Sequence, residues 1–213
     1  MKKLMSFILA LVLVFSAGSY AFAETDERNN IDAFFSTGEI PETLNGIDQF
    51  FTILTDGTIS FDIDSALSAG YAEEDVVFVS NNIKKMNYLL TEMDGYLTPD
   101  FSLVIPISGT RAVGESKIVT TWYGLTQVYM NSDEAQDLID ELNAVGDIIA
   151  ISGFLALLPS PYSTLVGFYL YGTSMGILIY RNQVISAASA GTGIIMNIMD
   201  IDGENQTVWF TAQ

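Results

Sequence analysis

Chemistry in this chain has to come from carboxylates, amines or hydroxyls, because the sequence contains no histidine and no cysteine. Histidine is the commonest general base, cysteine is the commonest thiol nucleophile, and both are usual zinc ligands. Histidine-dependent metalloproteases, cysteine proteases and serine–histidine triads are therefore excluded. The reactions that remain are paired-carboxylate chemistry of the glycosidase kind and catalysis by a lysine or threonine nucleophile.

Three groups of acidic residues lie close enough in sequence to supply such a pair. They are Asp62 with Asp64, Glu73 with Glu74 and Asp75, and Asp200 with Asp202 and Glu204. Aspartate and glutamate together number 26, however, so neighbouring carboxylates are expected by chance. We interpret these groups as solvated faces and helix caps, assign no catalytic residue, and keep a cell-wall glycan hydrolase as the third of three functional hypotheses.

The stretch 200–205 also has oxygen-rich side chains of the kind that bind calcium. It lacks the third spaced acidic ligand and the distal bidentate glutamate of an EF-hand, and its Asp202-Gly203 pair favours a hairpin turn. We therefore interpret it as a strand end followed by a turn. The glycines at 191 and 193 lack the lysine of a phosphate-binding loop, so the sequence predicts neither a metal site nor a cofactor.

The N-terminus predicts export. Two lysines precede an apolar run at 7–15, and Ala21-Phe22-Ala23 has the pattern of a signal-peptide cleavage site. Residues 1–23 are therefore interpreted as a signal peptide, and the mature protein as secreted or bound to the cell envelope. A retained anchor fits less well, because the apolar run is shorter than the roughly 20 residues that span a bilayer.

The net charge of −18 limits the partners, and removal of the two N-terminal lysines makes the mature chain more negative still. Nucleic acid is excluded, because phosphate binding needs clustered lysine and arginine. Anionic lipid head groups are disfavoured for the same reason, although burial of apolar surface can overcome the repulsion.

Residues 148–180, the apolar segment, contain no charged side chain. The capping pair Asn131 and Glu134 begins a helical spacing that predicts one helix over 132–158. Two prolines at 159 and 161 force a turn, and a second helix is expected over 163–180 and towards residue 190. This helical hairpin either meets a membrane or a membrane protein, or fills the core of a soluble protein.

Five residues are candidates for membrane contact or for packing between the two helices. Gly172 and Gly176 form a G-x-x-x-G motif, which lets helix backbones approach closely in a membrane or in a soluble hairpin. Trp122 and Tyr123 suit either a membrane interface or a core. Leu170 lies within the predicted second helix, so a charge placed there would distinguish buried core from displayed surface.

The predicted fold class is α+β, a helical hairpin packed on a small antiparallel sheet with an acidic N-terminal α/β portion over 24–114. In the part 115–213, strands are expected at 117–130, with a bend at Gly124, and at 194–201 and 207–211.

In the N-terminal portion, apolar spacing predicts a surface helix from Asp75 to Gly95, and Pro106 restricts 101–107 to an edge strand or a strand end. Around Asp56-Gly57 a β-hairpin competes with a helix over 47–54.

The run 115–124, the capped helix, the apolar segment, the Gly191-Thr192-Gly193 step and the C-terminal 208–213 together resemble small secreted Gram-positive proteins, some of them called bacteriocin-like. The resemblance covers roughly 115–213. It implies a secreted, non-enzymatic protein whose hairpin engages a membrane or a membrane protein, which is the first hypothesis. A soluble extracellular binding module, in which the hairpin is only core, is the second. The acidity of the chain argues against cationic killing activity.

Overall fold

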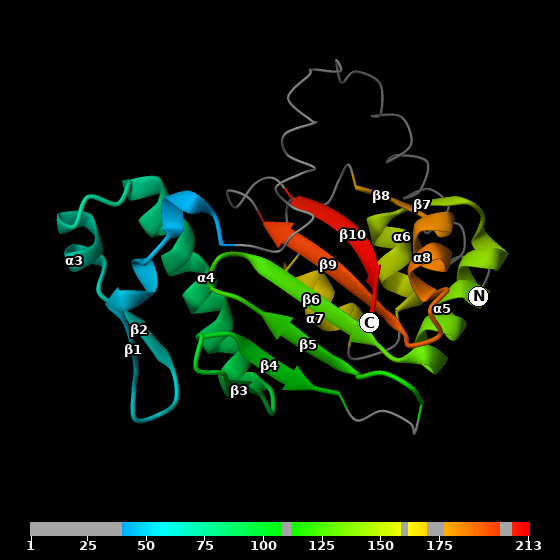
Figure 1. The fold of residues 1–213 in the computed structure, drawn as a ribbon, viewed down its shortest axis with the longest axis horizontal. Coiled ribbons are helices and arrows are strands. Elements are labelled where there is room, and N and C mark those ends of the chain that lie inside the picture. Colours follow the sequence, from blue (N-terminus) through cyan, green and yellow to red (C-terminus); the bar gives the residue numbers. More distant parts are fainter. Residues whose placement is uncertain (1–39, 108–111, 159–161, 170–176, 201–205) are drawn as a thin grey trace, which may run out of the picture. The chain divides into compact units, whose positions relative to one another are not determined.

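A six-stranded antiparallel sheet organises the computed structural model, which describes residues 40–107, 112–158, 162–169, 177–200 and 206–213 (Figure 1). The combination of helices with antiparallel sheets confirms the α+β class. In spatial order, the strands are β10 (Gln206–Ala212), β9 (Ile194–Asp200), β6 (Leu125–Met130), β5 (Lys117–Thr120), β4 (Leu103–Pro106) and β3 (Tyr96–Leu97).

The β-rich run at 117–130 forms two strands rather than one bent strand. β5 and β6 pair in antiparallel register, with Thr120 opposite Thr126, and the chain reverses between them. Gly124 has a φ of 89°, a value that suits glycine, and its N–H donates to the Thr121 carbonyl at 3.3 Å. Trp122 therefore lies in a turn. The sequence predicted a bend at Gly124 but not a full reversal of the chain there.

One face of the sheet carries the alternating residues that are most deeply buried. Ile118 on β5, Val128 on β6 and Met196 on β9 are each 0 % exposed. Successive strand residues point to opposite faces, so the same face continues to Thr126 and Asp200 at the other end of these strands. Helices contribute the rest of the core on this face.

In the first part of the described chain, the predicted surface helix and the strand end at Pro106 are confirmed, and of the two alternatives around Asp56-Gly57 the structure has the β-hairpin. β1 (Phe51–Ile53) and β2 (Ile59–Phe61) form the hairpin around Asp56-Gly57, α4 (Glu73–Glu92) is the predicted surface helix, and Pro106 ends β4. The other elements of this part are the 3₁₀ turns η1 (Glu42–Leu44) and η2 (Ile47–Phe50) and the helix α3 (Ile63–Ser68).

The predicted helix over 132–158 is wrong in its length. α5 (Ser132–Val145) begins at the predicted capping box of Asn131 and Glu134, but it ends at Gly146, whose φ of 122° is open to glycine. The β-branched residues that follow form the strand β7 (Ile148–Ala150), and the chain then enters α6 (Ile151–Leu157). Gly146 was the local signal for the end of this helix, and the prediction missed it because the apolar residues keep a helical spacing beyond it.

The predicted helix over 163–180 is also shorter than expected. It is replaced by α7 (Tyr162–Tyr169), the strand β8 (Leu178–Tyr180) and α8 (Arg181–Ala188). β8 pairs with β7, with Ile149 opposite Ile179, so the two ends of the apolar segment meet in a two-stranded ribbon. α6 and α7 contact one another, and α7 contacts β6.

Residues 40–213 form one compact unit. The predicted signal peptide at 1–23 and the predicted turn at Asp202-Gly203 lie outside the described residues. Within this unit, Glu134 and Asn131 tie the start of α5 to β5: the Ser116 hydroxyl donates to Glu134 Oε2 at 2.7 Å, and Asn131 Nδ2 donates to Ser116 Oγ at 2.7 Å.

Candidate functional site

The two aromatic candidates from the sequence lie in an aromatic cluster, in which Trp122 is buried and Tyr123 is partly buried. Trp122 is 2 % exposed and packs edge-on against Phe51, with ring centroids 5.3 Å apart. Tyr123 packs edge-on against Trp122 at 5.3 Å, and burial raises the pKa of its hydroxyl. The structure thus places both residues where they stabilise the turn. Leu170, Gly172 and Gly176 lie outside the described residues.

The acidic groups of the sequence are separated by the fold. Asp62 caps α3, because its carboxylate accepts hydrogen bonds from the Ser65 N–H at 3.0 Å and the Ser65 hydroxyl at 2.7 Å, which lower the pKa of the carboxyl. Glu73, Glu74 and Asp75 occupy the first turn of α4. Asp200 is 7 % exposed. Asp202 and Glu204, which the sequence grouped with it, lie outside the described residues.

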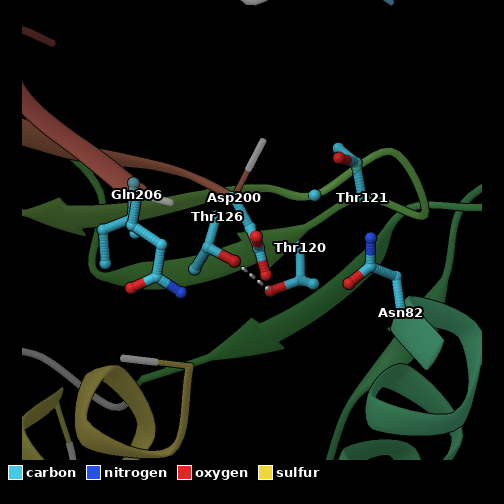
Figure 2. A pocket seen from close by; sticks show the side chains of 8 residues that line it. Asn82, Thr120, Thr121, Thr126, Asp200 and Gln206 are labelled. Carbon is cyan, nitrogen blue, oxygen red and sulfur yellow. Dashed lines mark hydrogen bonds between the residues drawn. The ribbon is translucent and has the colours of Figure 1, made fainter. Parts of the chain in front are cut away.

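Asp200 lies in a polar cavity between α4 and the sheet (Figure 2). Thr120 and Thr126 are cross-strand partners whose hydroxyls lie 3.3 Å apart, and Asn82 reaches towards them from α4. All four residues are at most 7 % exposed. Lys85, one turn after Asn82, places Nζ 3.5 Å from Asp200 Oδ2. Helix α4 and the ends of strands β5, β6 and β9 therefore meet through polar side chains.

The polar cavity is too small for an organic substrate. The space open to the centre of a water-sized sphere is about 10 Å³, close to the least that holds one water molecule. Asn82 Nδ2 is buried and has no hydrogen-bond partner among the described residues, so a single water accepting from it matches the cavity in size and polarity. Within the same part of the chain, no cluster of three or more acidic, histidine or cysteine residues could hold a metal ion.

Helices α6 and α7, the described helical part of the apolar segment, each bury apolar side chains. Phe154 on α6 and Val166 on α7 are 0 % exposed, and the ring of Phe154 packs on Phe210 of β10 with centroids 5.7 Å apart. Among the residues that the structure describes, no helix is long and apolar enough to cross a membrane.

Tyr162 fixes α7 to the sheet. It is 1 % exposed, and its hydroxyl lies within hydrogen-bond distance of the Tyr129 carbonyl and of Glu134 Oε2, both at 3.0 Å. Burial raises the pKa of this hydroxyl well above the usual tyrosine range, and the neighbouring Glu134 carboxylate acts in the same direction. The sequence did not predict this contact, since no local pattern reveals a partner 28 residues away.

The outer face of the β7–β8 ribbon is exposed and apolar. Ile148 is 55 % exposed, Leu178 50 % and Tyr180 41 %, and the pairing of β7 with β8 brings the three onto one face. We call these three residues the apolar strip. An ion pair flanks one end of the strip, in which Arg181 Nη2 lies 2.7 Å from Asp147 Oδ1.

A second surface feature is an open groove between α8 and β10. Asn182, Gln183 and Ser186 line it from the helix, and Trp209 and Thr211 line it from the strand. The space open to water-sized spheres is about 570 Å³. The sequence did not predict the groove, because neither the end of the sheet nor the position of α8 can be read from local patterns.

No family model, no curated protein and no solved structure matches this chain. Function is therefore inferred from the geometry of its sites and from the sequence.

Proposed function

We propose that the protein is an exported binding protein without catalytic activity, in which the apolar segment is part of the core. The observation that carries the proposal is the position of Tyr162. Its buried hydroxyl joins α7 to a β6 carbonyl and to the carboxylate of Glu134, which also accepts from the Asn131 N–H at 2.9 Å. Moving α7 into a membrane would leave these polar groups without their partners, at a cost of about 1–3 kcal/mol for each buried group.

The distribution of apolar side chains supports the same function. Ile151, Phe154 and Val166 are at most 1 % exposed, so the inner side of the apolar segment is already removed from water in the folded protein. Burial of apolar area is what a membrane would otherwise offer this segment. Export is the part of the proposal that rests on sequence, namely the signal-like residues 1–23.

Vesicle co-sedimentation tests the proposal. The folded chain 24–213 should stay in the supernatant with phosphatidylcholine vesicles and with phosphatidylglycerol vesicles, from about pH 7 to about pH 4.5. Carboxylates with reference pKa values near 4 begin to be protonated over this range, so repulsion by the net charge decreases and any latent affinity for lipid is revealed. Sedimentation of the folded protein at either pH would overturn the proposal.

A second candidate is an envelope-associated, bacteriocin-like protein that engages a membrane. The apolar strip favours it, because Ile148, Leu178 and Tyr180 expose contiguous apolar surface. In this candidate the protein binds lipid through the strip while α6 and α7 stay packed. The variant Ile148→Ser/Leu178→Ser separates the two functions: lipid binding that this variant abolishes supports the second candidate, whereas wild-type protein that never sediments excludes it.

A further inference from the structure

We propose that the groove between α8 and β10 binds an extended peptide segment of neutral or positive charge, which adds to the sheet as a strand beside β10. The inference rests on the proposed binding function and names its partner class. Among the described strands, β9 is the neighbour of β10, which leaves β10 at one end of the sheet order (Figure 1). The unpaired edge of a sheet is a template for another extended chain.

The register identifies the backbone groups that face the groove. The Gln213 N–H donates to the Gly193 carbonyl at 3.3 Å, so residue 213 is bonded towards β9. In an antiparallel pair, alternate residues direct their N–H and C=O groups to opposite sides of the strand. Thr211 and Trp209 therefore bond to β9, whereas Ala212, Phe210 and Val208 direct their backbone groups to the outer edge.

The composition of β10 leaves this edge open. Gln206–Ala212 contains no charged residue and no proline, the two devices that proteins commonly use to block edge strands. The strand is seven residues long, and its exposure increases at Thr211 and Ala212, beside the groove. An extended partner can therefore pair with the outward-facing backbone groups of alternate residues along β10.

The groove also specifies the chemistry of the partner. The side chains that α8 contributes are amides and a hydroxyl, from Asn182, Gln183 and Ser186, and Trp209 adds an aromatic surface. None of these lining groups is charged, while the whole protein carries a net charge of −18. The net charge of the protein attracts a cationic peptide and repels an acidic one, and the uncharged lining of the groove accommodates a neutral peptide.

Two adjacent proline variants test the backbone contacts directly. Ala212→Pro removes an N–H that faces the groove, and proline is tolerated on the solvent side of an edge strand. Thr211→Pro removes an N–H that faces β9, together with the hydroxyl that accepts from Asn197 Nδ2 at 3.2 Å, and serves as the contrasting variant at the neighbouring exposed position. Ala212→Pro should fold like the wild type, with an unchanged far-ultraviolet spectrum and only a small change in urea midpoint.

The probe is a library of random heptapeptides displayed on phage and selected against the folded chain 24–213. Selected peptides, made synthetically, should carry a net charge of zero or above and should change the fluorescence of Trp209 on binding, while a Trp209→Phe variant removes that signal. Their affinity for Ala212→Pro should fall about tenfold or more, the equivalent of one strong backbone hydrogen bond. Methylation of one backbone nitrogen in the peptide that pairs with β10 should weaken binding similarly.

Three results would overturn the inference. These are selection of no peptide above background, equal affinity of the selected peptides for wild type and Ala212→Pro, and a wild-type dimer in light scattering that Ala212→Pro converts to a monomer. The last would show that a second copy occupies the edge. Vesicle sedimentation is measured separately, so a lipid-binding protein that also binds peptides would contradict the proposed function and leave this inference standing.

Discussion

The two ends of one sheet face are filled in opposite ways. At one end, Val128 and Met196 belong to the same apolar core as Phe154 and Val166, whereas at the other end Thr126 and Asp200 border the polar cavity under α4. The two sets lie on the same strands, β6 and β9, a few residues apart. Among the described residues of the apolar segment, Ile151, Phe154 and Val166 are at most 1 % exposed, so apolar side chains at this end serve burial in the folded protein.

The largest effect is expected from a charge at the apolar end. Val166→Arg places an unpaired cation at a position that is 0 % exposed, and we expect it to destabilise the fold by about 3–5 kcal/mol or to prevent folding. Urea unfolding followed by circular dichroism measures the change. Thr164→Arg, at an exposed position on the same helix, is the control and should stay within about 0.5 kcal/mol of wild type. Equal stability of the two variants would place α7 outside the core.

The next largest effect is expected from the two proline variants of β10, Thr211→Pro and Ala212→Pro. They test which backbone N–H groups of this strand bond to β9 and which face the groove. Thr211→Pro removes a hydrogen bond to β9 and should cost about 3 kcal/mol, by analogy with proline in the interior of other hydrogen-bonded elements. Ala212→Pro should cost less than about 1 kcal/mol, since its N–H faces the groove. The urea midpoints of the two variants are compared directly. If Ala212→Pro destabilised the protein more than Thr211→Pro, the N–H of Ala212 rather than that of Thr211 would bond to β9. The register given for β10 would then be wrong by one residue.

A smaller effect is expected at the polar end. Lys85→Met removes the cation beside Asp200, whose side chain is 9 % exposed, and should destabilise the protein by about 1–3 kcal/mol. The value is at the low end for a buried pair because the Lys85 side chain is 34 % exposed. Lys84→Met, at the exposed neighbouring position, is the matched control and should be close to neutral. Thermal unfolding at low and high salt provides the comparison.

The smallest effect is expected from Tyr162→Phe, at about 1 kcal/mol for the lost hydrogen bonds, together with a change in pH dependence. The pKa of Tyr162 is raised above its ordinary value of 10.0, so the folded protein keeps a proton that the unfolded chain loses above about pH 10. Stability from this group is complete below pH 10 and decreases as the pH rises further. Urea unfolding from pH 8 to 11 should show a steeper alkaline loss for wild type than for Tyr162→Phe. Parallel curves would contradict the buried position of the hydroxyl.

Local signals in the sequence predicted the elements that depend on local physics. The capping box of Asn131 and Glu134, the turn at Asp56-Gly57 and the strand end at Pro106 each follow from backbone or side-chain groups within a few residues. Local signals predicted the wrong element where two of them disagreed. Helical spacing continued through Gly146, and only the glycine indicated that α5 ends there.

The sites could not be predicted in this way, because their members are far apart in the chain. Asn82, Thr120 and Asp200 meet only when α4 lies against the sheet, and Tyr162 finds Glu134 only after α7 has packed. The groove beside β10 depends on strand order, which follows from the whole sheet. Sequence reasoning identified Asp200 as one of several acids, but nothing local distinguished it from the solvated ones.

Hydrogen–deuterium exchange with and without phosphatidylcholine vesicles tests the central claim, that the apolar segment is core, most directly. At pH 7 the backbone amides of α6 and α7 should exchange only through global unfolding, at rates that vesicles leave unchanged, because Tyr162 and Phe154 hold both helices in the folded protein. Exchange in the disordered reference, the chain unfolded in urea, sets the scale. Fast exchange of α6 and α7 in buffer, or a change in their protection on adding vesicles, would contradict the account.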